Sequence, residues 1–244
     1  MEIYFQIKFV LLGKNFNKKD VLKNLMSNNN SEYKLAIFDM DGTILNGRGI
    51  FTIAEKFGFD KKLKEYFKRK DIEYYKKSIE IAKLCKGYKK TDFLDVFRTI
   101  EYNEYLEKII DEIKKRGMKT AIATDSYQFL ADDIKKRLDF DYAFANDLIT
   151  NSNYITGELV IHNKNLIPDY ISGNIYSICK SDVLEKLCNK IGISEKESIA
   201  IGDGIVDSGM IKKAGLGVAY NAPDYVNKHA DICINDYHDL LKEL

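Results

Sequence analysis

The chain alternates between short runs of consecutive apolar residues and longer segments in which apolar residues recur every three or four positions. The first run, Leu35-Ala36-Ile37-Phe38, has the length and composition of a buried strand. The segment from Asn103 carries apolar residues at 106, 109, 110 and 113 and stops at Gly117, which predicts a helix with Asn103 as its N-cap. Further strand-like runs lie at 119–123, 142–145, 198–201, 218–219 and 232–234. This order predicts an α/β fold with a Rossmann-like, doubly wound parallel sheet.

Two segments interrupt the alternation. Residues 48–100 follow a helical pattern without a strand-like run and contain 15 Lys or Arg against 8 Asp or Glu, a net charge of +7. Residues 1–32 end in a run of Ser and Asn that is typical of a linker. We therefore expect an N-terminal appendage and linker over 1–32, an α/β core formed by 33–47 and 101–244, and a small helical cap over 48–100. Within the core, residues 154–161 predict a β-hairpin or flap.

The composition excludes several classes of protein. With 244 residues, 45% of them apolar and 31% charged, the chain can build one core with an insertion and is not disordered. A formal net charge of +1 creates no overall field that attracts nucleic acid or an anionic membrane. No apolar run reaches the length of about 18 residues that a membrane span needs, so we expect a cytoplasmic protein without nucleic-acid or membrane partners. The 4 cysteines lack metal-binding spacing, which argues against zinc or disulfides.

Acidic residues directly follow two of the predicted strands. Asp39-Met40-Asp41-Gly42-Thr43 comes after the run 35–38, and Gly202-Asp203-Gly204-Ile205-Val206-Asp207 comes after the run 198–201. The carboxyl ends of parallel strands line the edge of the sheet at which ligands bind in open α/β folds, so these four carboxylates are expected to converge. A simple turn is the alternative for the first motif taken alone, because Asp and Gly favour turns.

Four converging carboxylates repel one another unless a cation neutralises them. Oxygen ligands without His or Cys favour Mg²⁺, which often bridges to phosphate. A carboxylate beside such an ion can attack phosphorus to give an aspartyl phosphate, and a second carboxylate can protonate the leaving oxygen and then activate water. The two motifs therefore predict phosphoryl chemistry at a magnesium site.

With its motifs in this order, the chain resembles the haloacid dehalogenase superfamily over about residues 34–244, and within it the phosphoserine phosphatase group. The motifs at 39–43 and 202–207 resemble the first and the fourth of that family, while Thr124 resembles the second and Lys180 the third. The hydroxyl of Thr124 and the N–H groups that follow it can cradle phosphate oxygens, although a helix N-cap is the alternative for this residue. The ammonium of Lys180 can compensate the nucleophile and the phosphoryl oxygens.

The resemblance also implies the roles of the aspartates. Asp39 is expected to be the nucleophile and Asp41 the general acid and base. Mg²⁺ is expected to bind to the Asp39 carboxylate, the backbone carbonyl of Asp41 and Asp203, with Asp207 supporting the site. By the same resemblance, residues 48–100 are the cap that covers the site and selects the leaving group.

Three positions depart from the phosphoserine phosphatase pattern. Nine residues after the nucleophile, where that pattern has a glutamate that receives the substrate ammonium, the chain has Arg48. We therefore expect phosphoserine to be a poor substrate and the leaving group to be neutral or anionic. Asp125-Ser126 replaces a Gly-Gly pair, so the carboxylate of Asp125 must turn away from the phosphate or bind a substrate hydroxyl. Val206 stands where Asn is frequent. The residues expected to contact the substrate are Arg48, Gly42, Thr43, Asp125 and Ser126.

Together these features predict a Mg²⁺-dependent phosphomonoester hydrolase that acts on a small phosphorylated metabolite through a phosphoaspartate. A phosphotransferase or mutase of the same fold would use the same intermediate. A binding or regulatory protein on a phosphatase scaffold is the alternative outside catalysis. The sequence does not fix the oligomeric state.

Overall fold

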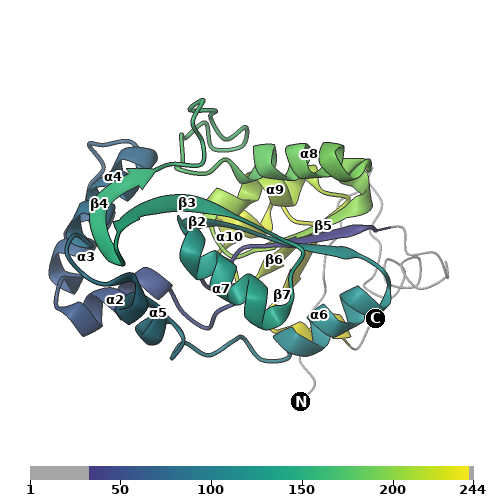
Figure 1. Ribbon diagram of the computed structural model, residues 1–244. Helices are drawn as coiled ribbons and strands as arrows, with labels where there is room; N and C mark the ends of the chain where they lie inside the picture. Colours follow the sequence, from purple (N-terminus) through teal and green to yellow (C-terminus); the bar gives the residue numbers. More distant parts are fainter. Residues whose placement is uncertain (1–32, 242–244) are drawn as a thin grey trace, which may run out of the picture.

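The computed structural model describes residues 33–241 and contains one mostly parallel sheet of seven strands (Figure 1). The strand order is β4-β3-β2-β1-β5-β6-β7, and only β3 and β4 are antiparallel. The predicted α/β fold class is confirmed. The strands are β1 (Leu35–Phe38), β2 (Lys119–Tyr127), β3 (Tyr142–Asn151), β4 (Tyr154–Val160), β5 (Ser198–Gly202), β6 (Leu216–Tyr220) and β7 (Ile232–Ile234). The expectations for residues 1–32 lie outside the described residues.

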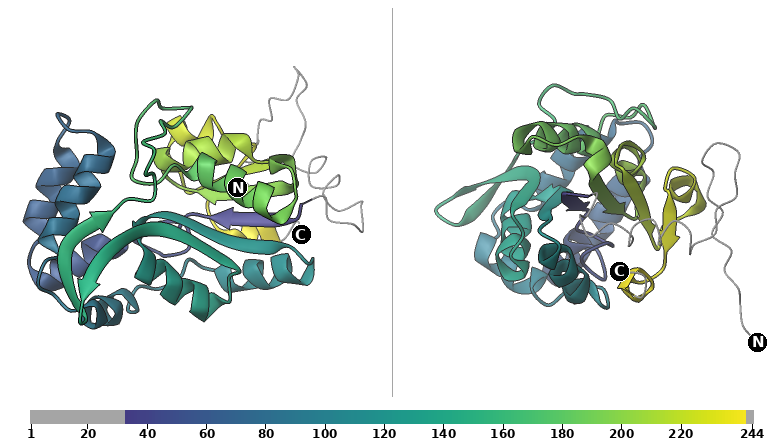
Figure 2. Two further views of the ribbon diagram at one scale, coloured as in Figure 1. Left: turned by 45° about the horizontal axis from the view of Figure 1, so that its top comes forward. Right: turned by 90° about the vertical axis from the view of Figure 1, so that its right-hand side faces the viewer.

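Helices cover both faces of the sheet. The side chains of the central strand β1 point alternately to the two faces, and all four are buried because each face is covered. Ala36 and Phe38 pack with α6 (Leu106–Lys115), α7 (Gln128–Leu138) and α11 (Tyr237–Leu241). Leu35 and Ile37 pack with α8 (Lys180–Ile191) and α9 (Ser208–Lys213). Figure 2 shows the green helices above the sheet and the teal helices below it. Short helical turns complete the core: η1 (Glu195–Glu197), η2 (Ile205–Asp207) and α10 (Asp224–Asn227).

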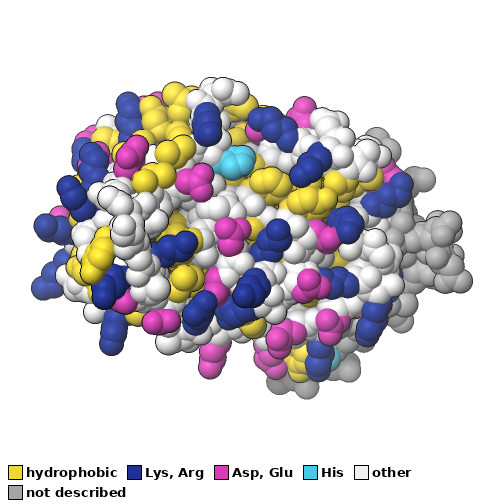
Figure 3. Space-filling view, viewed as in Figure 1, with side chains coloured by type: hydrophobic (Ala, Val, Ile, Leu, Met, Phe, Trp, Pro, Cys, Tyr) yellow, Lys and Arg dark blue, Asp and Glu magenta, His cyan; other side chains and the backbone are white. Residues whose placement is uncertain are grey.

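Four consecutive helices lie between β1 and α6 and form a small layer beside the sheet, at the left of Figure 1. Their buried apolar side chains belong to the same hydrophobic cluster as α6 and α7. In Figure 3 many basic side chains lie on the surface of this end of the molecule, at the left of the view. Acidic and basic side chains are mixed over the visible face. The four helices, which we call the cap, are α2 (Gly49–Phe57), α3 (Asp60–Lys68), α4 (Tyr74–Leu84) and α5 (Lys90–Phe97).

Strands β3 and β4 form a long hairpin whose tip reaches the cap. Ser152 and Asn153 both have positive φ (47° and 75°), as two-residue hairpin turns require. The segment between α4 and α5 pairs with this tip through backbone hydrogen bonds of 2.8 Å from Gly87 N to Ile155 O, from Ile155 N to Tyr88 O and from Lys90 N to Asn153 O. The prediction of a hairpin or flap within residues 154–161 was therefore wrong in its bounds: Tyr154–Val160 is a single strand, β4, which pairs with β3 to form the hairpin and is the edge of the main sheet.

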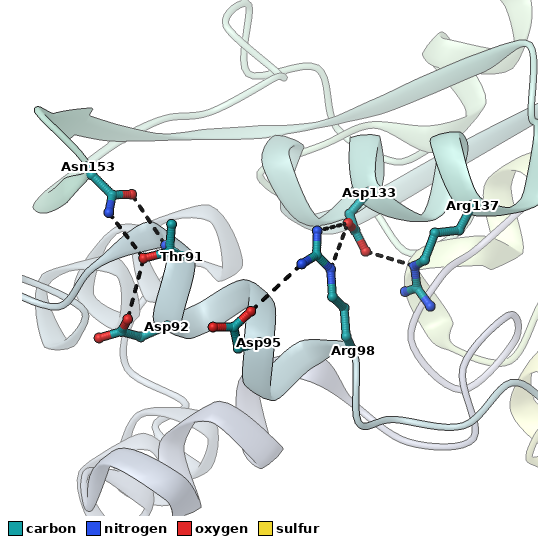
Figure 4. A network of polar contacts seen from close by, with 7 residues as sticks. All are labelled: Thr91, Asp92, Asp95, Arg98, Asp133, Arg137 and Asn153. Carbon is teal, nitrogen blue, oxygen red and sulfur yellow. Dashed lines mark hydrogen bonds and ion pairs between the residues drawn. The ribbon is translucent and has the colours of Figure 1, made fainter.

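Side chains add two further contacts between cap and core (Figure 4). Asn153 at the hairpin tip bonds with Thr91, its Nδ2 lying 3.1 Å from Thr91 Oγ1. Arg98, which follows α5, donates to Asp133 of α7 at 2.7 Å, and Arg137 donates to the other oxygen of the same carboxylate at 2.8 Å. The cap is thus joined to the core at the hairpin and at α7 as well as through the chain itself.

Among the described residues, no helix is both long and apolar enough to cross a membrane.

Candidate active site

The carboxylates of the two acidic motifs meet at one edge of the sheet. Strands β1 and β5 are parallel neighbours with Phe38 opposite Ile201, and the N–H of Asp39 donates to Ile201 O at 2.9 Å. The next residues along both strands therefore emerge together. Asp39, Asp203 and Asp207 each offer a carboxylate oxygen, and these oxygens lie within 4.8 Å of one another.

Lys180 lies at the centre of this cluster. It begins α8, is only 2% exposed, and places its Nζ 2.6 Å from Asp39 Oδ1 and 2.5 Å from Asp207 Oδ1. Burial alone would lower the pKa of its ammonium, but the charges of Asp207 and Asp39 outweigh burial and raise that pKa above its ordinary value. A buried lysine is tolerated only when it is paired in this way. Its predicted place beside Asp39 is what the structure shows.

The crowded carboxylates hold their protons more tightly than free ones. Burial raises the pKa of Asp39 well above its ordinary value, and Asp207 raises it further, while Lys180 opposes the rise. Burial and the charge of Asp207 raise the pKa of Asp203 to about 6. Burial is the larger cause of both shifts, and repulsion from Asp207 adds to it.

The donor set fits a Mg²⁺ ion. It consists of carboxylate oxygens alone, which is the ligand chemistry that Mg²⁺ prefers. Asp39 Oδ1 is buried and, although it lies 2.6 Å from Lys180 Nζ, accepts no well-directed hydrogen bond from any residue in 33–241. A cation bound at this edge would satisfy that oxygen and offset the repulsion among the three aspartates.

Asp41 stands apart from this cluster and faces the cap. Its Oδ1 accepts a hydrogen bond of 2.5 Å from the N–H of Gly49, the first residue of α2. Burial raises the pKa of Asp41 to about 6, against the lowering effect of the Gly49 N–H. The side chain of Asp41 is not one of the three clustered carboxylates, and the role of its backbone carbonyl as a Mg²⁺ ligand stays a prediction.

Glycines in both acidic motifs allow the aspartates to approach one another. Gly42 has φ +87°, and a Cβ at this residue would lie 2.5 Å from Asp203 Oδ2. A Cβ on Gly202 would lie 2.4 Å from Asp207 Cγ. The Asp207 carboxylate is also fixed by the N–H groups of Asp203 and Gly204, at 3.1 and 2.9 Å. Both acidic motifs therefore need glycine at these positions, because the backbone lies too close to the carboxylates to leave space for a side chain.

Two asparagines support the loops of the site, the partly buried Asn103 and the buried Asn146, and sequence reasoning missed both. Asn103 was expected to cap a helix, but α6 begins at Leu106 and its N-cap is Tyr105. The Nδ2 of Asn103 instead donates to the carbonyl of Thr43 at 2.6 Å, and also to the carbonyls of Gly42 and Leu45. The interpretation of Asn103 as a cap was wrong, because its amide satisfies carbonyls of the first acidic motif, about 60 residues away in sequence.

Thr124 and the residues after it form a second loop at the same edge. Thr124 is fully buried, and its Oγ1 accepts a hydrogen bond from Ser126 N at 3.2 Å. The alternative role of Thr124 as a helix N-cap does not hold, because α7 begins four residues later with Tyr127 as its cap. Asn146, the second of these asparagines, donates from Nδ2 to Asp125 O at 2.7 Å and to Ser126 O at 3.3 Å. Thr43, also buried, donates to Asp203 Oδ1 at 3.4 Å.

A pocket lies between this edge of the sheet and the cap. It has an empty volume of about 410 Å³, part of which is open to solvent. The core contributes Asp41, Asp125, Ser126 and Tyr127, and the cap contributes Ile50, Phe67, Ser78 and Ile81. A ligand held there would contact the carboxylates of Asp41 and Asp125 on one side and cap residues on the other.

Arg48 lies just before α2 and is exposed. Partial burial would lower the pKa of its guanidinium, but the negative charges of Asp203 and Asp125, followed by those of Asp41 and Asp39, raise it above its ordinary value. Arg48 therefore stands within electrostatic reach of the carboxylates although it does not line the pocket.

Comparison with known proteins agrees with this geometry. The chain is 30% identical over 215 residues to a phosphoserine phosphatase of Methanocaldococcus jannaschii, covering 86% of this chain and 96% of that protein. It is 30% identical over 216 residues to a phosphoserine phosphatase of Archaeoglobus fulgidus, of which it spans only 59%. A solved structure described as a phospho-aspartyl intermediate analogue of phosphoserine phosphatase superposes with a TM-score of 0.73 at 29% identity, covering 87% of this chain and 99% of that one.

A sequence model of a known family extends over most of the chain. It matches residues 36–212, a range that contains the acidic motif after β1, Thr124, Lys180 and the acidic motif after β5. The chain belongs to the haloacid dehalogenase-like hydrolase family.

Proposed function

We propose that this protein is a Mg²⁺-dependent phosphomonoesterase that hydrolyses a small phosphorylated metabolite through a phosphoaspartate on Asp39. The observation that carries the proposal is the buried contact of Asp39 with Lys180, beside the carboxylates of Asp203 and Asp207. The names of the relatives support it, since they are phosphatases that cover most of this chain.

The residues of the site can carry the reaction in two steps. In the first, the Asp39 carboxylate attacks phosphorus, the bond to the leaving oxygen breaks, and Asp41 gives its proton to that oxygen. A pKa of about 6 leaves Asp41 able to donate this proton and then to act as a base near neutral pH. In the second step, Asp41 takes a proton from water, which attacks phosphorus and releases phosphate from Asp39.

Other residues stabilise the charges that develop. Lys180 remains within 2.6 Å of Asp39 and offsets charge on the nucleophile and the phosphoryl oxygens. The loop of Thr124 and Ser126 is fixed by the hydrogen bond from Ser126 N to Thr124 Oγ1, and the hydroxyl of Thr124 can still donate to a phosphate oxygen. Bound Mg²⁺, held by Asp39 and Asp203 with Asp207 behind them, would supply positive charge for the phosphate oxygens.

The identity of the ester is a separate question. The pocket is small and has both apolar and hydroxyl-bearing walls. Arg48 motivated the prediction that phosphoserine is a poor substrate, but the relatives named phosphoserine phosphatase give that prediction no support. Phosphoserine therefore belongs among the esters to be tested. The cytoplasmic location stays a prediction.

The test is Mg²⁺-dependent release of phosphate from p-nitrophenyl phosphate and from a panel of small phosphate esters that includes phosphoserine. Asp39→Asn should abolish turnover while circular dichroism stays unchanged, and Asp147→Asn, an exposed change on β3, is the control. Incorporation of oxygen-18 from water into the released phosphate distinguishes hydrolysis from transfer to a second alcohol. A folded protein that releases no phosphate from any ester would favour the binding or regulatory alternative.

A further inference from the structure

Asp125 occupies an unusual place in the pocket. It follows the buried Thr124, and its backbone carbonyl is fixed by Asn146 at 2.7 Å, so its position does not depend on its own side chain. The side chain is exposed and lines the pocket together with Asp41. Among residues 33–241 no backbone or side-chain group donates a hydrogen bond to its carboxylate.

This carboxylate is unfavourable for a phosphatase unless the substrate uses it. Its charge contributes to raising the pKa of both Asp39 and Asp41, so it acts on the reaction centre itself. A phosphate dianion that approaches Asp39 would meet the same repulsion. Two cations lie near this edge. Lys180 is already paired with Asp39 and Asp207, and the charge of Asp203 acts on Arg48 more strongly than that of Asp125 does.

The opposite wall of the pocket offers little compensation. Three of its four cap residues, Ile50, Phe67 and Ile81, have no hydrogen-bond donor in their side chains. The fourth, Ser78, directs its hydroxyl to the carbonyl of Tyr74 in its own helix at 3.5 Å. Water can hydrate the exposed carboxylate of Asp125, and a ligand that displaces this water from the pocket must replace its hydrogen bonds.

We propose that Asp125 is a specificity-determining residue that accepts a hydrogen bond from a hydroxyl or ammonium group on the leaving group. The preferred substrates are then phosphate esters of small alcohols that carry a second O–H or N–H donor, and plain alkyl phosphates are disfavoured. This inference rests on the proposed phosphatase function and adds the chemistry of the leaving group to it.

Matched pairs of esters test the inference. Glycerol 1-phosphate and propyl phosphate have the same carbon chain, as do phosphoethanolamine and ethyl phosphate, and only the first of each pair has a donor. The wild-type protein should show the higher kcat/KM for the donor-bearing ester. Asp125→Ala should lower kcat/KM for both donor-bearing esters by about 10- to 100-fold, the range expected for a hydrogen bond to a charged group. Turnover of propyl and ethyl phosphate should stay unchanged or rise, because repulsion of the dianion is relieved.

A second variant separates the two kinds of donor. Asp125→Asn keeps an acceptor oxygen but removes the charge, so it should lower kcat/KM for phosphoethanolamine more than for glycerol 1-phosphate. Asp147→Ala, which removes an exposed carboxylate of β3 outside the pocket, is the control and should not change the ranking of the esters.

The outcomes are distinct. Equal losses for all four esters in Asp125→Ala would show that the residue acts on the fold or on the phosphate. An unchanged ranking of the esters would show that it does not contact the leaving group. Either result overturns the inference. If alkyl phosphates are hydrolysed in an Asp39-dependent manner, the proposed function survives such a failure. A wild-type protein without activity on any ester would overturn both.

Discussion

Replacement of Lys180 by methionine should separate the cost of the buried charges from the cost of lost packing. Methionine has nearly the length of lysine but no charge, so Lys180→Met leaves the space filled. Each of the two ion pairs, at 2.6 and 2.5 Å, corresponds to an attraction of about 6 kcal/mol at an effective dielectric constant of about 20. Removal of water from the three charged groups offsets most of this attraction.

The expected net effect is a loss of about 3 to 5 kcal/mol in the free energy of unfolding of the metal-free protein, as for other buried pairs that lose one partner. The sign with pH follows from the pKa of Lys180, which is raised by folding. Its stabilising contribution is complete below the ordinary lysine pKa of about 10.4 and is lost only as the pH rises through the higher folded value, so it is fully present at pH 7. With Mg²⁺ present, kcat/KM should fall by about 10²- to 10³-fold.

Lys186→Met is the matched control in the same helix. Lys186 pairs with Asp182 at 2.7 Å, but its side chain is 62% exposed, and such surface pairs contribute about 1 kcal/mol or less. Urea unfolding followed by circular dichroism in the presence of a chelator gives the free energies, and phosphate release gives kcat/KM. If Lys180→Met is no more harmful than Lys186→Met in both measurements, the central role of this ammonium is refuted.

Three further predictions concern the glycines, the ion and a buried thiol. Gly202→Ala should abolish Mg²⁺-dependent turnover, because the added Cβ would lie 2.4 Å from Asp207 Cγ. Gly204→Ala is the control: its nearest contact would be 3.6 Å, so kcat/KM in the same phosphate assay should change by no more than about twofold. Mg²⁺ at about 100 times its Kd should raise the free energy of unfolding by about 2.7 kcal/mol, and thermal denaturation of Asp203→Asn should show most of that gain lost; an equal gain would place the ion elsewhere. Burial raises the pKa of Cys85 to about 12, so at pH 9 iodoacetamide should modify Cys85 far more slowly in the native protein than in urea. Because the folded thiol keeps a proton that the unfolded thiol releases, its contribution to stability falls as the pH rises from about 9 to about 12.

The sequence predicts the acidic centre well because each motif directly follows a strand of the parallel sheet. Once β1 and β5 are neighbours, Asp39 and Asp203 lie at the same edge without any further information. The importance of Lys180 was predicted from its place between the motifs in the sequence. In the structure Lys180 is buried and paired with Asp39.

Contacts between side-chain amides and distant carbonyls were not predictable in this way. Asn103 and Asn146 bond to loops that are about 60 and 20 residues away, and no periodicity in the sequence marks such pairs. The length of β3 was also underestimated. Its apolar run stops at Ala145, but the strand continues to Asn151 with alternating burial because β4 pairs with it, and the signal for that pairing is the weak turn sequence at 152–153.

The joint between the β3–β4 hairpin and the cap constrains how the pocket can open. The cap is connected to the core by the segments before α2 and after α5. If the cap rotated about these two segments alone, the three backbone hydrogen bonds at the hairpin tip would have to break during each turnover. If those bonds persist, the outer edge of the sheet must bend with the cap. Any movement of the cap that admits the ester or releases phosphate would therefore bend two strands that contribute none of the clustered aspartates.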